Sequence, residues 1–269
     1  MGSGDPAGDG SPGNGVRHRG LKQDNAQLLF KAVVHLQVVR VSDRLRQDAP
    51  TNAVSAMPRY QGAQRRIGLT GGIASGKSSV GRHLETLGLP LLDADAFARD
   101  ALSPGSNASK AVLDRFGASI QQAPISRETG KPPLINRAEL GRIVFNNPVE
   151  RQWLEQLIHP IVSARFSQEL QHLHERAAVV LMIPLLFEAG LTHLCSEIWV
   201  VTCTPEQQLQ RLQARDQLSK EDANARIQAQ WPLTQKIKLA DQVIDNSGQP
   251  DQWKAQLQQI SHTTGCKGV

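Results

Sequence analysis

Cysteine, aromatic residues and long apolar runs are all scarce in this chain of 269 residues. The three cysteines, Cys195, Cys203 and Cys266, show no C-x-x-C spacing, which argues against a zinc site and a disulfide framework. We expect them to be small buried side chains in a reducing compartment. Aromatic residues make up only 4% of the chain, so aliphatic side chains must fill most of the core. No apolar run approaches the roughly 20 residues that cross a bilayer, which predicts a soluble protein without a membrane partner.

The N-terminal stretch differs in composition from the rest of the chain. Residues 1–20 are dominated by Gly, Pro, Ser and Asp, and such a segment cannot bury enough apolar surface to offset its ordering entropy. Early acidic residues do not fit a transit peptide, and no uninterrupted apolar core fits a secretory signal. We therefore interpret residues 1–63 as a low-complexity, disordered extension of a cytoplasmic protein. Met57 is a natural start for the functional polypeptide, although a helix over residues 28–45 that packs on the body stays open.

From Arg65 onward, apolar runs alternate with helical patterns. The expected strands are 66–70, 89–92, 178–183, 198–202 and 242–245. The helical patterns that separate them cover 76–87, 205–215, 220–230 and 252–260. Such alternation is typical of a parallel sheet with helices on both faces, so we predict an α/β fold with about five strands.

One interval interrupts this alternation, between the second and the third expected strand. About eighty residues lie there, whereas a simple crossover needs only a dozen or so. Helical spacing covers 108–116, 137–145 and 149–175, the last interrupted at Pro160. We interpret residues 103–175 as an inserted helical subdomain that shapes a substrate site.

A glycine-rich motif follows the first strand. Residues Gly71 to Ser78 match G-x-x-x-x-G-K-[ST] at every fixed position. Gly71 and Gly76 permit close backbone approach, and successive N–H groups with the following helix N-terminus form an anion cradle. Lys77 would reach the β- and γ-phosphates of ATP, and the Ser78 hydroxyl would ligate Mg²⁺. The predicted phosphate-binding residues are Gly71, Gly72, Ile73, Ala74, Ser75, Gly76, Lys77, Ser78 and Ser79.

Two carboxylates, Asp93 and Asp95, follow the second strand. In an open parallel sheet, the carboxyl end of a strand faces the ligand crevice. A carboxylate there can deprotonate an acceptor hydroxyl while a neighbour organises Mg²⁺, directly or through water. We choose Asp95 as the base and as a metal-site residue, and Arg99 as a ligand for an anionic substrate. The alternative that one carboxylate only caps the next helix stays open.

Arginines gather on two later helical segments. Arg211, Arg215 and Arg226 are suited to binding the oxygens of a transferring phosphoryl group. Closure of a small helical lid over residues 211–230 would also exclude water. A solvated helix face is the alternative for any single arginine. We expect Arg211 and Arg215 to bind ATP, with Arg215 acting in catalysis.

On these motifs, the chain resembles the dephospho-coenzyme A kinase family from Ile67 to about Trp253. The resemblance rests on an ordered series: the phosphate loop, Asp93-Ala-Asp95 with Arg99, Val144-Phe145, His159-Pro160, Ile183-Pro-Leu-Leu-Phe-Glu188, Arg211 to Arg215, and Val243-Ile-Asp-Asn-Ser-Gly248. It implies a P-loop kinase domain over residues 64–262, with core segments 64–102 and 176–262, the helical insertion and the lid. It also implies ATP-dependent phosphorylation of the ribose 3′-hydroxyl of dephospho-coenzyme A, with Mg²⁺.

The same resemblance implies further site residues. Asp95 looks like the general base, and Asp93, Asp95, Arg99, His159, Arg165 and Glu188 look like substrate-binding residues. The loop around Asn246 looks like a neighbour of adenine. The chain departs from the family at Met182, where an acid usually precedes I-P-L-L-F-E. Since methionine cannot ligate Mg²⁺, the metal would depend more heavily on Ser78, Asp93, Asp95 and bound phosphate.

Two other functions compete with this interpretation. One is another P-loop kinase for a small metabolite or nucleotide, which the length of the insertion and the IPLLFE string disfavour. The other is a nucleic-acid-binding or regulatory ATP-binding module, suggested only by the net charge of +5. A single Tyr and six Phe do not form a base-stacking platform, so we expect no nucleic-acid partner. The sequence does not specify an oligomeric state.

Overall fold

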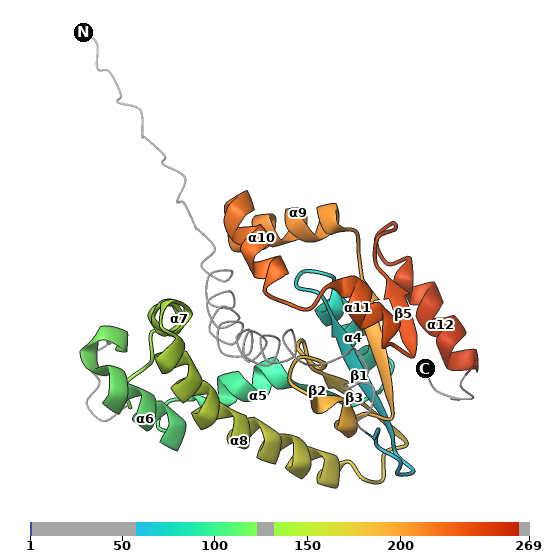
Figure 1. The fold of residues 1–269 in the computed structure, drawn as a ribbon, viewed down its shortest axis with the longest axis horizontal. Coiled ribbons are helices and arrows are strands. Elements are labelled where there is room, and N and C mark those ends of the chain that lie inside the picture. The colour runs from blue at the N-terminus through green and yellow to red at the C-terminus, as the bar shows by residue number, and fades with distance from the viewer. Residues whose placement is uncertain (2–57, 123–131, 264–269) are drawn as a thin grey trace, which may run out of the picture.

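The computed structural model describes residue 1, residues 58–122 and residues 132–263. Its central element is a parallel sheet of five strands in the order β2-β3-β1-β4-β5 (Figure 1). The strands are β1 (Arg65–Gly71), β2 (Leu91–Asp93), β3 (Ala178–Met182), β4 (Glu197–Thr202) and β5 (Gln242–Asp245). The prediction of an α/β fold with a parallel sheet is confirmed.

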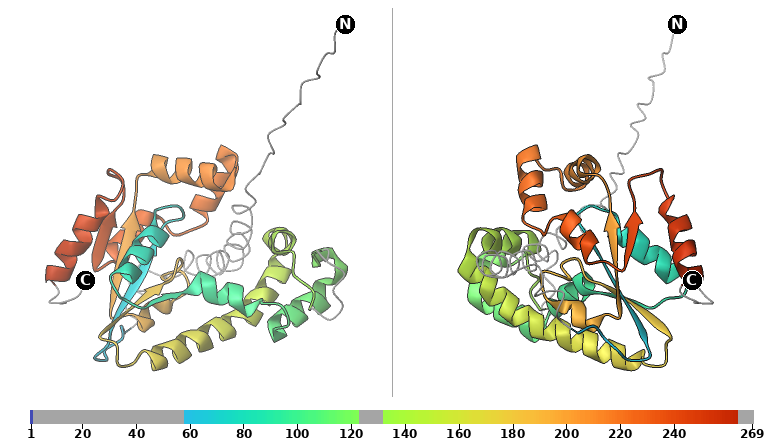
Figure 2. Two further views of the ribbon diagram at one scale, coloured as in Figure 1. Left: turned by 180° about the vertical axis from the view of Figure 1, so that it is seen from behind. Right: turned by 45° about the vertical axis from the view of Figure 1, so that its right-hand side comes forward.

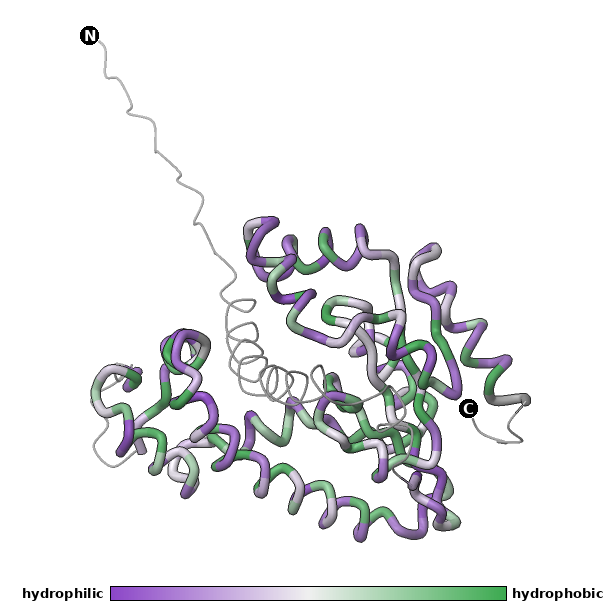
Figure 3. The backbone as a smooth tube through the Cα atoms, in the orientation of Figure 1, coloured by the Kyte–Doolittle hydropathy of each residue, from purple (hydrophilic) through white to green (hydrophobic). Residues whose placement is uncertain are grey.

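The interior strand β3 is apolar and buried on both faces, because helices cover both sides of the sheet there. Along β3, Val179 and Leu181 join the larger apolar cluster, whereas Val180 and Met182 join the cluster on the opposite face. This alternation is the period of two that a strand imposes on its side chains. Figure 3 shows the resulting concentration of apolar residues along the central strands.

Each face is covered by its own pair of helices. The helices α4 (Lys77–Thr86) and α12 (Trp253–Thr263) contribute Val80 and Leu257 to the cluster that holds Met182. On the other face, α5 (Ala94–Ala101) and α8 (Pro148–His172) contribute Ala98 and Phe166 to the larger cluster. Figure 2 shows these two layers on opposite sides of the sheet.

Residues between β2 and β3 form helices that project from the sheet. They are α6 (Asn107–Phe116), a 3-10 turn (Gly117–Ile120), α7 (Arg137–Asn146) and α8 (Figure 1). The expected interruption at Pro160 is wrong, since α8 continues through that residue. Proline removes one helical hydrogen bond. Burial of Ile158 and Phe166, on either side of it, stabilises the continuous helix.

Three helices lie between β4 and β5. These are α9 (Pro205–Asp216), α10 (Lys220–Gln228) and α11 (Leu233–Lys238). Thr204 and Gln207 form a capping box at the start of α9, and the Ser219 side chain caps α10. In Figure 1, the α9–α10 pair stands beyond the carboxyl end of the sheet, above the loop that joins β1 to α4.

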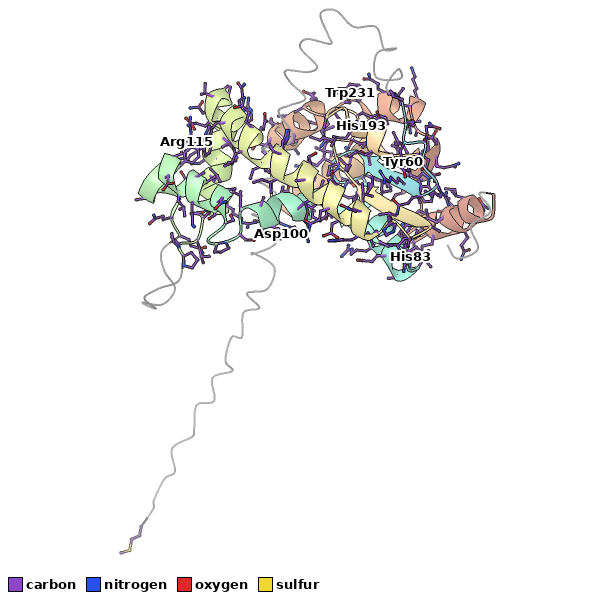
Figure 4. All side chains as sticks on the ribbon, turned by 90° about the horizontal axis from the view of Figure 1, so that it is seen from below. Tyr60, His83, Asp100, Arg115, His193 and Trp231 are labelled. Atoms are coloured by element: carbon purple, nitrogen blue, oxygen red, sulfur yellow. The ribbon has the colours of Figure 1, made fainter. Side chains whose placement is uncertain are left out.

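Contacts between the described N-terminal residues and the folded body begin at Arg59. Arg59 forms an ion pair with Asp241 at 3.1 Å, and the Tyr60 backbone N–H donates to the Cys195 carbonyl at 3.0 Å. The Arg66 guanidinium lies over the Tyr60 ring. Figure 4 shows Tyr60 against the sheet, far from Arg115 on the projecting helices. The expectations for residues 2–57 lie outside the described residues.

Two of the cysteines belong to the core. Cys195 and Cys203 are buried and form no disulfide, and burial raises the pKa of the Cys195 thiol to about 12. Cys266 lies outside the described residues. Within the described part of the chain, no helix is long and apolar enough to span a membrane.

Candidate functional site

The loop between β1 and α4 has the backbone geometry of an anion cradle. Gly76 precedes α4 with a φ of 100°, a conformation that L side chains rarely adopt. Ala74 also lies in the left-handed region, with a φ of 59°. No acidic residue occupies the first turn of α4. The positive end of the helix dipole and the free N–H groups of that turn are therefore available to an anion.

A cavity of about 320 Å³ opens over this loop. It brings together all of the predicted phosphate-binding residues from Gly71 to Ser79, together with Asp95, Arg211 and Arg215. Its other lining residues are Arg82, Pro184, Leu185 and Gln230. The cavity thus joins the phosphate loop, one carboxylate and two arginines that are far apart in the sequence.

The two carboxylates after β2 have different environments. Asp93 caps α5, since its side chain accepts a hydrogen bond from the Asp95 backbone N–H at 2.9 Å. Asp95 lies in the first turn of α5 and lines the cavity, whereas Asp93 does not. The capping alternative therefore applies to Asp93, and Asp95 is the carboxylate placed beside the phosphate loop.

Hydrogen bonds and ion pairs hold the arginine side chains of α9 at the cavity. Arg211 donates from Nη2 to the Asn246 carbonyl at 3.1 Å. Arg215 pairs with Asp216 at 2.7 Å, and Arg226 of α10 pairs with the same carboxylate at 3.2 Å. The side chain of Asp216 is only 6% exposed, so this ion pair is partly shielded from water. Asp216 thereby fixes the guanidinium of Arg215 at the cavity wall.

Asn246 supports the loop from the end of β5. Its side-chain Nδ2 donates to the Ser75 carbonyl at 2.9 Å. A Cβ at Gly76 would lie 2.1 Å from this Nδ2 atom, which is a second reason why glycine is required there. The Asn246 residue does not itself line the described cavity.

Four of the predicted substrate residues lie on α5 and α8 or between β3 and β4, outside the cavity. Phe97 of α5 packs edge-on against Phe166 of α8 with ring centroids 5.0 Å apart, which joins the helices that carry Arg99, His159 and Arg165. Arg165 forms an ion pair with Glu169 at 2.8 Å, and its guanidinium lies 5.8 Å from the Phe97 ring centroid. Burial lowers the pKa of His159.

Glu188, the last residue of the IPLLFE string, is fully buried. Its Oε1 atom lies 2.6 Å from the Nζ atom of Lys236, whose side chain is also 0% exposed. The same oxygen accepts a hydrogen bond from the Trp231 backbone N–H at 3.1 Å. Burial lowers the pKa of Lys236, Glu188 opposes this shift, and the positive charge of Lys77 lowers the pKa further.

The described residues fit a magnesium ion that completes its shell with phosphate and water. Ser78 and Asp95 supply two oxygen donors to one cavity. Among the described residues, no group of three or more His, Cys, Asp or Glu side chains could hold a metal by itself. Met182 is 5% exposed, and its side chain packs among Leu69 and Val80 on the α4 face of the sheet.

Sequence reasoning missed several residues of this site. Gln208, Gln230, Asp216 and Lys236 carry no motif of their own. Asp216 offered the clearest signal, because an acid beside Arg215 and ten residues before Arg226 could have been considered as their partner. The contacts of the two glutamines depend on how loops meet in space, which no spacing rule reports.

Comparisons with known proteins agree with this geometry. Residues 65–252 match the family model described as dephospho-CoA kinase. The dephospho-CoA kinase of Synechococcus sp. (strain CC9605) is 58% identical over 198 residues, which cover 74% of this chain and 92% of that protein. The dephospho-CoA kinase of Synechocystis sp. (strain ATCC 27184 / PCC 6803 / Kazusa) is 50% identical over 189 residues, which cover 69% and 89%.

Two solved structures are similar in fold. TT1252 from Thermus thermophilus superposes with a TM-score of 0.62 at 33% identity, covering 75% of this chain and 98% of that one. Dephospho-CoA kinase from Campylobacter jejuni superposes with a TM-score of 0.54 at 27% identity and the same coverage. The chain belongs to the dephospho-CoA kinase family and has the family's P-loop kinase fold.

Proposed function

We propose that this chain transfers the γ-phosphoryl group of ATP to the ribose 3′-hydroxyl of dephospho-coenzyme A, giving coenzyme A and ADP. The observation that carries the proposal is one cavity that joins the whole phosphate loop to Asp95, Arg211 and Arg215. It supplies the three kinds of group that phosphoryl transfer to an alcohol needs: an anion cradle, a base and cations.

The phosphates of ATP would lie in the loop from Gly71 to Ser79. Lys77 would neutralise charge on the β- and γ-phosphates, and the N–H groups at the start of α4 would bind their oxygens. Arg211 and Arg215 would bind oxygens that gain charge as the phosphoryl group moves. Asn246 would contact the adenine through its backbone.

Asp95 would act as the general base. Its carboxylate would take the proton of the acceptor hydroxyl while that oxygen bonds to the γ-phosphorus and the bond to ADP breaks. Ser78 and Asp95 would hold Mg²⁺, directly or through water, and the ion would neutralise phosphate charge when bound. Met182 is no alternative ligand, since it lies in the core.

The acceptor would lie against α5 and α8. Arg99, Arg165 and His159 would bind its polar groups. Asp93, which caps α5, and the buried Glu188 would support the walls of this site. Residues 103–175 would form the acceptor-binding subdomain, and residues 211–230 a lid over the phosphates. We place this activity in the cytoplasm. The net charge of +5 suits the two anionic substrates. We propose no nucleic-acid partner, because a single Tyr and six Phe do not form a base-stacking platform.

An acceptor panel tests the proposal. We expect ADP release by the purified chain to require dephospho-coenzyme A and to be negligible with AMP, adenosine or shikimate at the same concentration. Lys77→Ala should abolish ADP release and leave the melting temperature unchanged, because Lys77 acts on phosphate rather than on packing. Equal turnover with another acceptor would contradict the substrate assignment, and near-normal turnover of a stable Lys77→Ala protein would contradict the loop assignment.

A further inference from the structure

We propose that Gln208 and Gln230 are positioning residues that hold the Ile73 peptide of the phosphate loop and tie it to the α9–α10 helix pair. The inference deepens the function proposed above and rests on its placement of the ATP phosphates. Position 73 is variable in the phosphate-loop motif, so the motif assigns Ile73 no role.

Both polar groups of the Ile73 residue are bound by carboxamide side chains. The Ile73 N–H donates to Oε1 of Gln230 at 2.8 Å. The Ile73 carbonyl accepts from Nε2 of Gln208, also at 2.8 Å. Gln208 belongs to α9 and is 7% exposed, whereas Gln230 follows the end of α10 and lines the cavity. Ile73 is therefore hydrogen-bonded both to the first half of α9, through Gln208, and to the segment that follows α10, through Gln230.

The Ile73 side chain adds an apolar contact to these two hydrogen bonds. It is 7% exposed and forms a small cluster with Leu212 of α9 and Ala223 of α10. The cluster is separate from the two clusters that cover the sheet. Ile73 is thus part of the loop through its backbone and part of the small core of α9 and α10 through its side chain.

The neighbouring residues explain why this conformation has to be held. Ala74, the next residue, has a φ of 59°, which is unfavourable for a side chain that has a Cβ. At Gly72, a Cβ would lie 2.5 Å from Nε2 of Gln208, so glycine is needed to let the glutamine reach the loop. A loop with these requirements is preorganised for phosphate only while its peptides are fixed.

The arrangement also links the loop to the arginines. Arg211 and Arg215 lie on the same helix as Gln208 and line the same cavity. A shift of α9 relative to the loop would therefore change both the anion cradle and the cations opposite it. The two glutamine hydrogen bonds therefore help to set the distance between the loop and α9, together with the Ile73–Leu212 contact and the hydrogen bonds from Arg211 to Asn246 and from Asn246 to Ser75.

Calorimetric titration of the full chain with ADP and with inorganic tripolyphosphate tests the proposal. We expect Gln208→Met and Gln230→Met, which keep side-chain length and remove the carboxamide, each to weaken both ligands by about 3- to 10-fold, the effect of one hydrogen bond. The control is Gln210→Met, the same change at an exposed position of α9, which should bind like the wild type. The KM for ATP should rise, while the KM for dephospho-coenzyme A should stay unchanged.

A second variant covers the case in which a methionine variant does not fold. Gly72→Ala keeps both glutamines in the sequence, but the added Cβ would displace Nε2 of Gln208 from Ile73, so this variant should reproduce the weakened binding. A merely structural role would lower the melting temperature and leave the affinity for both ligands unchanged, and that result would overturn the proposal. If the wild type itself bound neither ADP nor tripolyphosphate, the proposed ATP site would fail, and the role of the glutamines with it.

Discussion

At the scale of single residues, the two carboxylates after β2 have the same chemistry but different positions, and therefore different roles. Asp93 and Asp95 are two residues apart and both half-buried, yet one caps a helix and the other lines the cavity. The hydrogen bond from the Asp95 backbone to Asp93 fixes the first turn of α5 and so places Asp95 beside the loop. Sequence reasoning chose Asp95 as the base and left open which carboxylate caps the helix; in the fold, Asp93 caps α5 and Asp95 lines the cavity.

This difference gives the first prediction. Asp95→Asn should lower kcat by about 10²- to 10⁴-fold, the usual contribution of a general base, because an amide cannot take the hydroxyl proton. Affinity for ADP should change little, which calorimetry can measure. Asp93→Asn is the comparison: asparagine is also a good N-cap and keeps Asp95 in place, so this change should lower kcat far less than Asp95→Asn. A large loss in the Asp93 variant together with normal turnover of the Asp95 variant would exchange the two roles.

At the scale of elements, a buried ion pair joins the connection between α10 and β5 to the segment that follows β3. Glu188 follows β3, and Lys236 lies in α11. The Phe187 and Trp231 rings beside them are nearly parallel, with centroids 6.3 Å apart. Sequence reasoning recognised Glu188 through the IPLLFE string but expected neither α11 nor the lysine, because a helix of six residues is too short to show periodicity.

Removing one partner of this pair should be costly. Lys236→Met leaves the Glu188 charge buried without its partner and should lower the free energy of unfolding by about 3–5 kcal/mol. Lys238→Met, the same change at an exposed position of α11, is the control and should change it by less than about 0.5 kcal/mol. Urea denaturation measures both, and adding Glu188→Gln to Lys236→Met should recover part of the loss. Equal stability of the two single variants would show that the pair is not buried in solution.

Met182 supports a second prediction about an element, the end of β3. The residue is 5% exposed, and a Cβ added at Gly81 would lie 2.9 Å from its sulfur. Met182→Asp should therefore destabilise the fold by burying a carboxylate among apolar side chains. It should not lower the MgCl₂ concentration needed for half-maximal turnover, and Met182→Leu should behave like the wild type. A stable Met182→Asp protein with tighter Mg²⁺ dependence would show that this strand end reaches the metal.

At the scale of the whole molecule, much of the architecture could be predicted from apolar periodicity. The five strands of the sheet lie within a few residues of the expected ranges, because strands buried on both faces form continuous apolar runs. The strand order β2-β3-β1-β4-β5 was not predicted, since periodicity does not report which strands are neighbours. The continuous α8 was also missed, because its contacts with the core outweigh the local effect of Pro160.

The candidate site divides in the same way. Residues within the phosphate loop could be predicted because one short segment carries the whole motif. Gln208, Gln230 and Lys236 could not, because their roles depend on contacts between segments separated by many residues. The resemblance to a family supplied the acceptor, which the local chemistry of the loop does not specify.

The function proposed for this cavity is transfer of the γ-phosphoryl group of ATP to one hydroxyl, the ribose 3′-hydroxyl of dephospho-coenzyme A. The most direct measurement incubates the purified full chain with ATP, MgCl₂ and dephospho-coenzyme A, and identifies the product by mass spectrometry and ³¹P NMR. A dephospho-coenzyme A analogue that lacks the ribose 3′-hydroxyl is the matched control. We expect one added phosphoryl group, on the 3′-oxygen, and no product from the analogue. Phosphorylation of the analogue, or ATP hydrolysis without a phosphorylated acceptor, would show that the 3′-hydroxyl is not the acceptor.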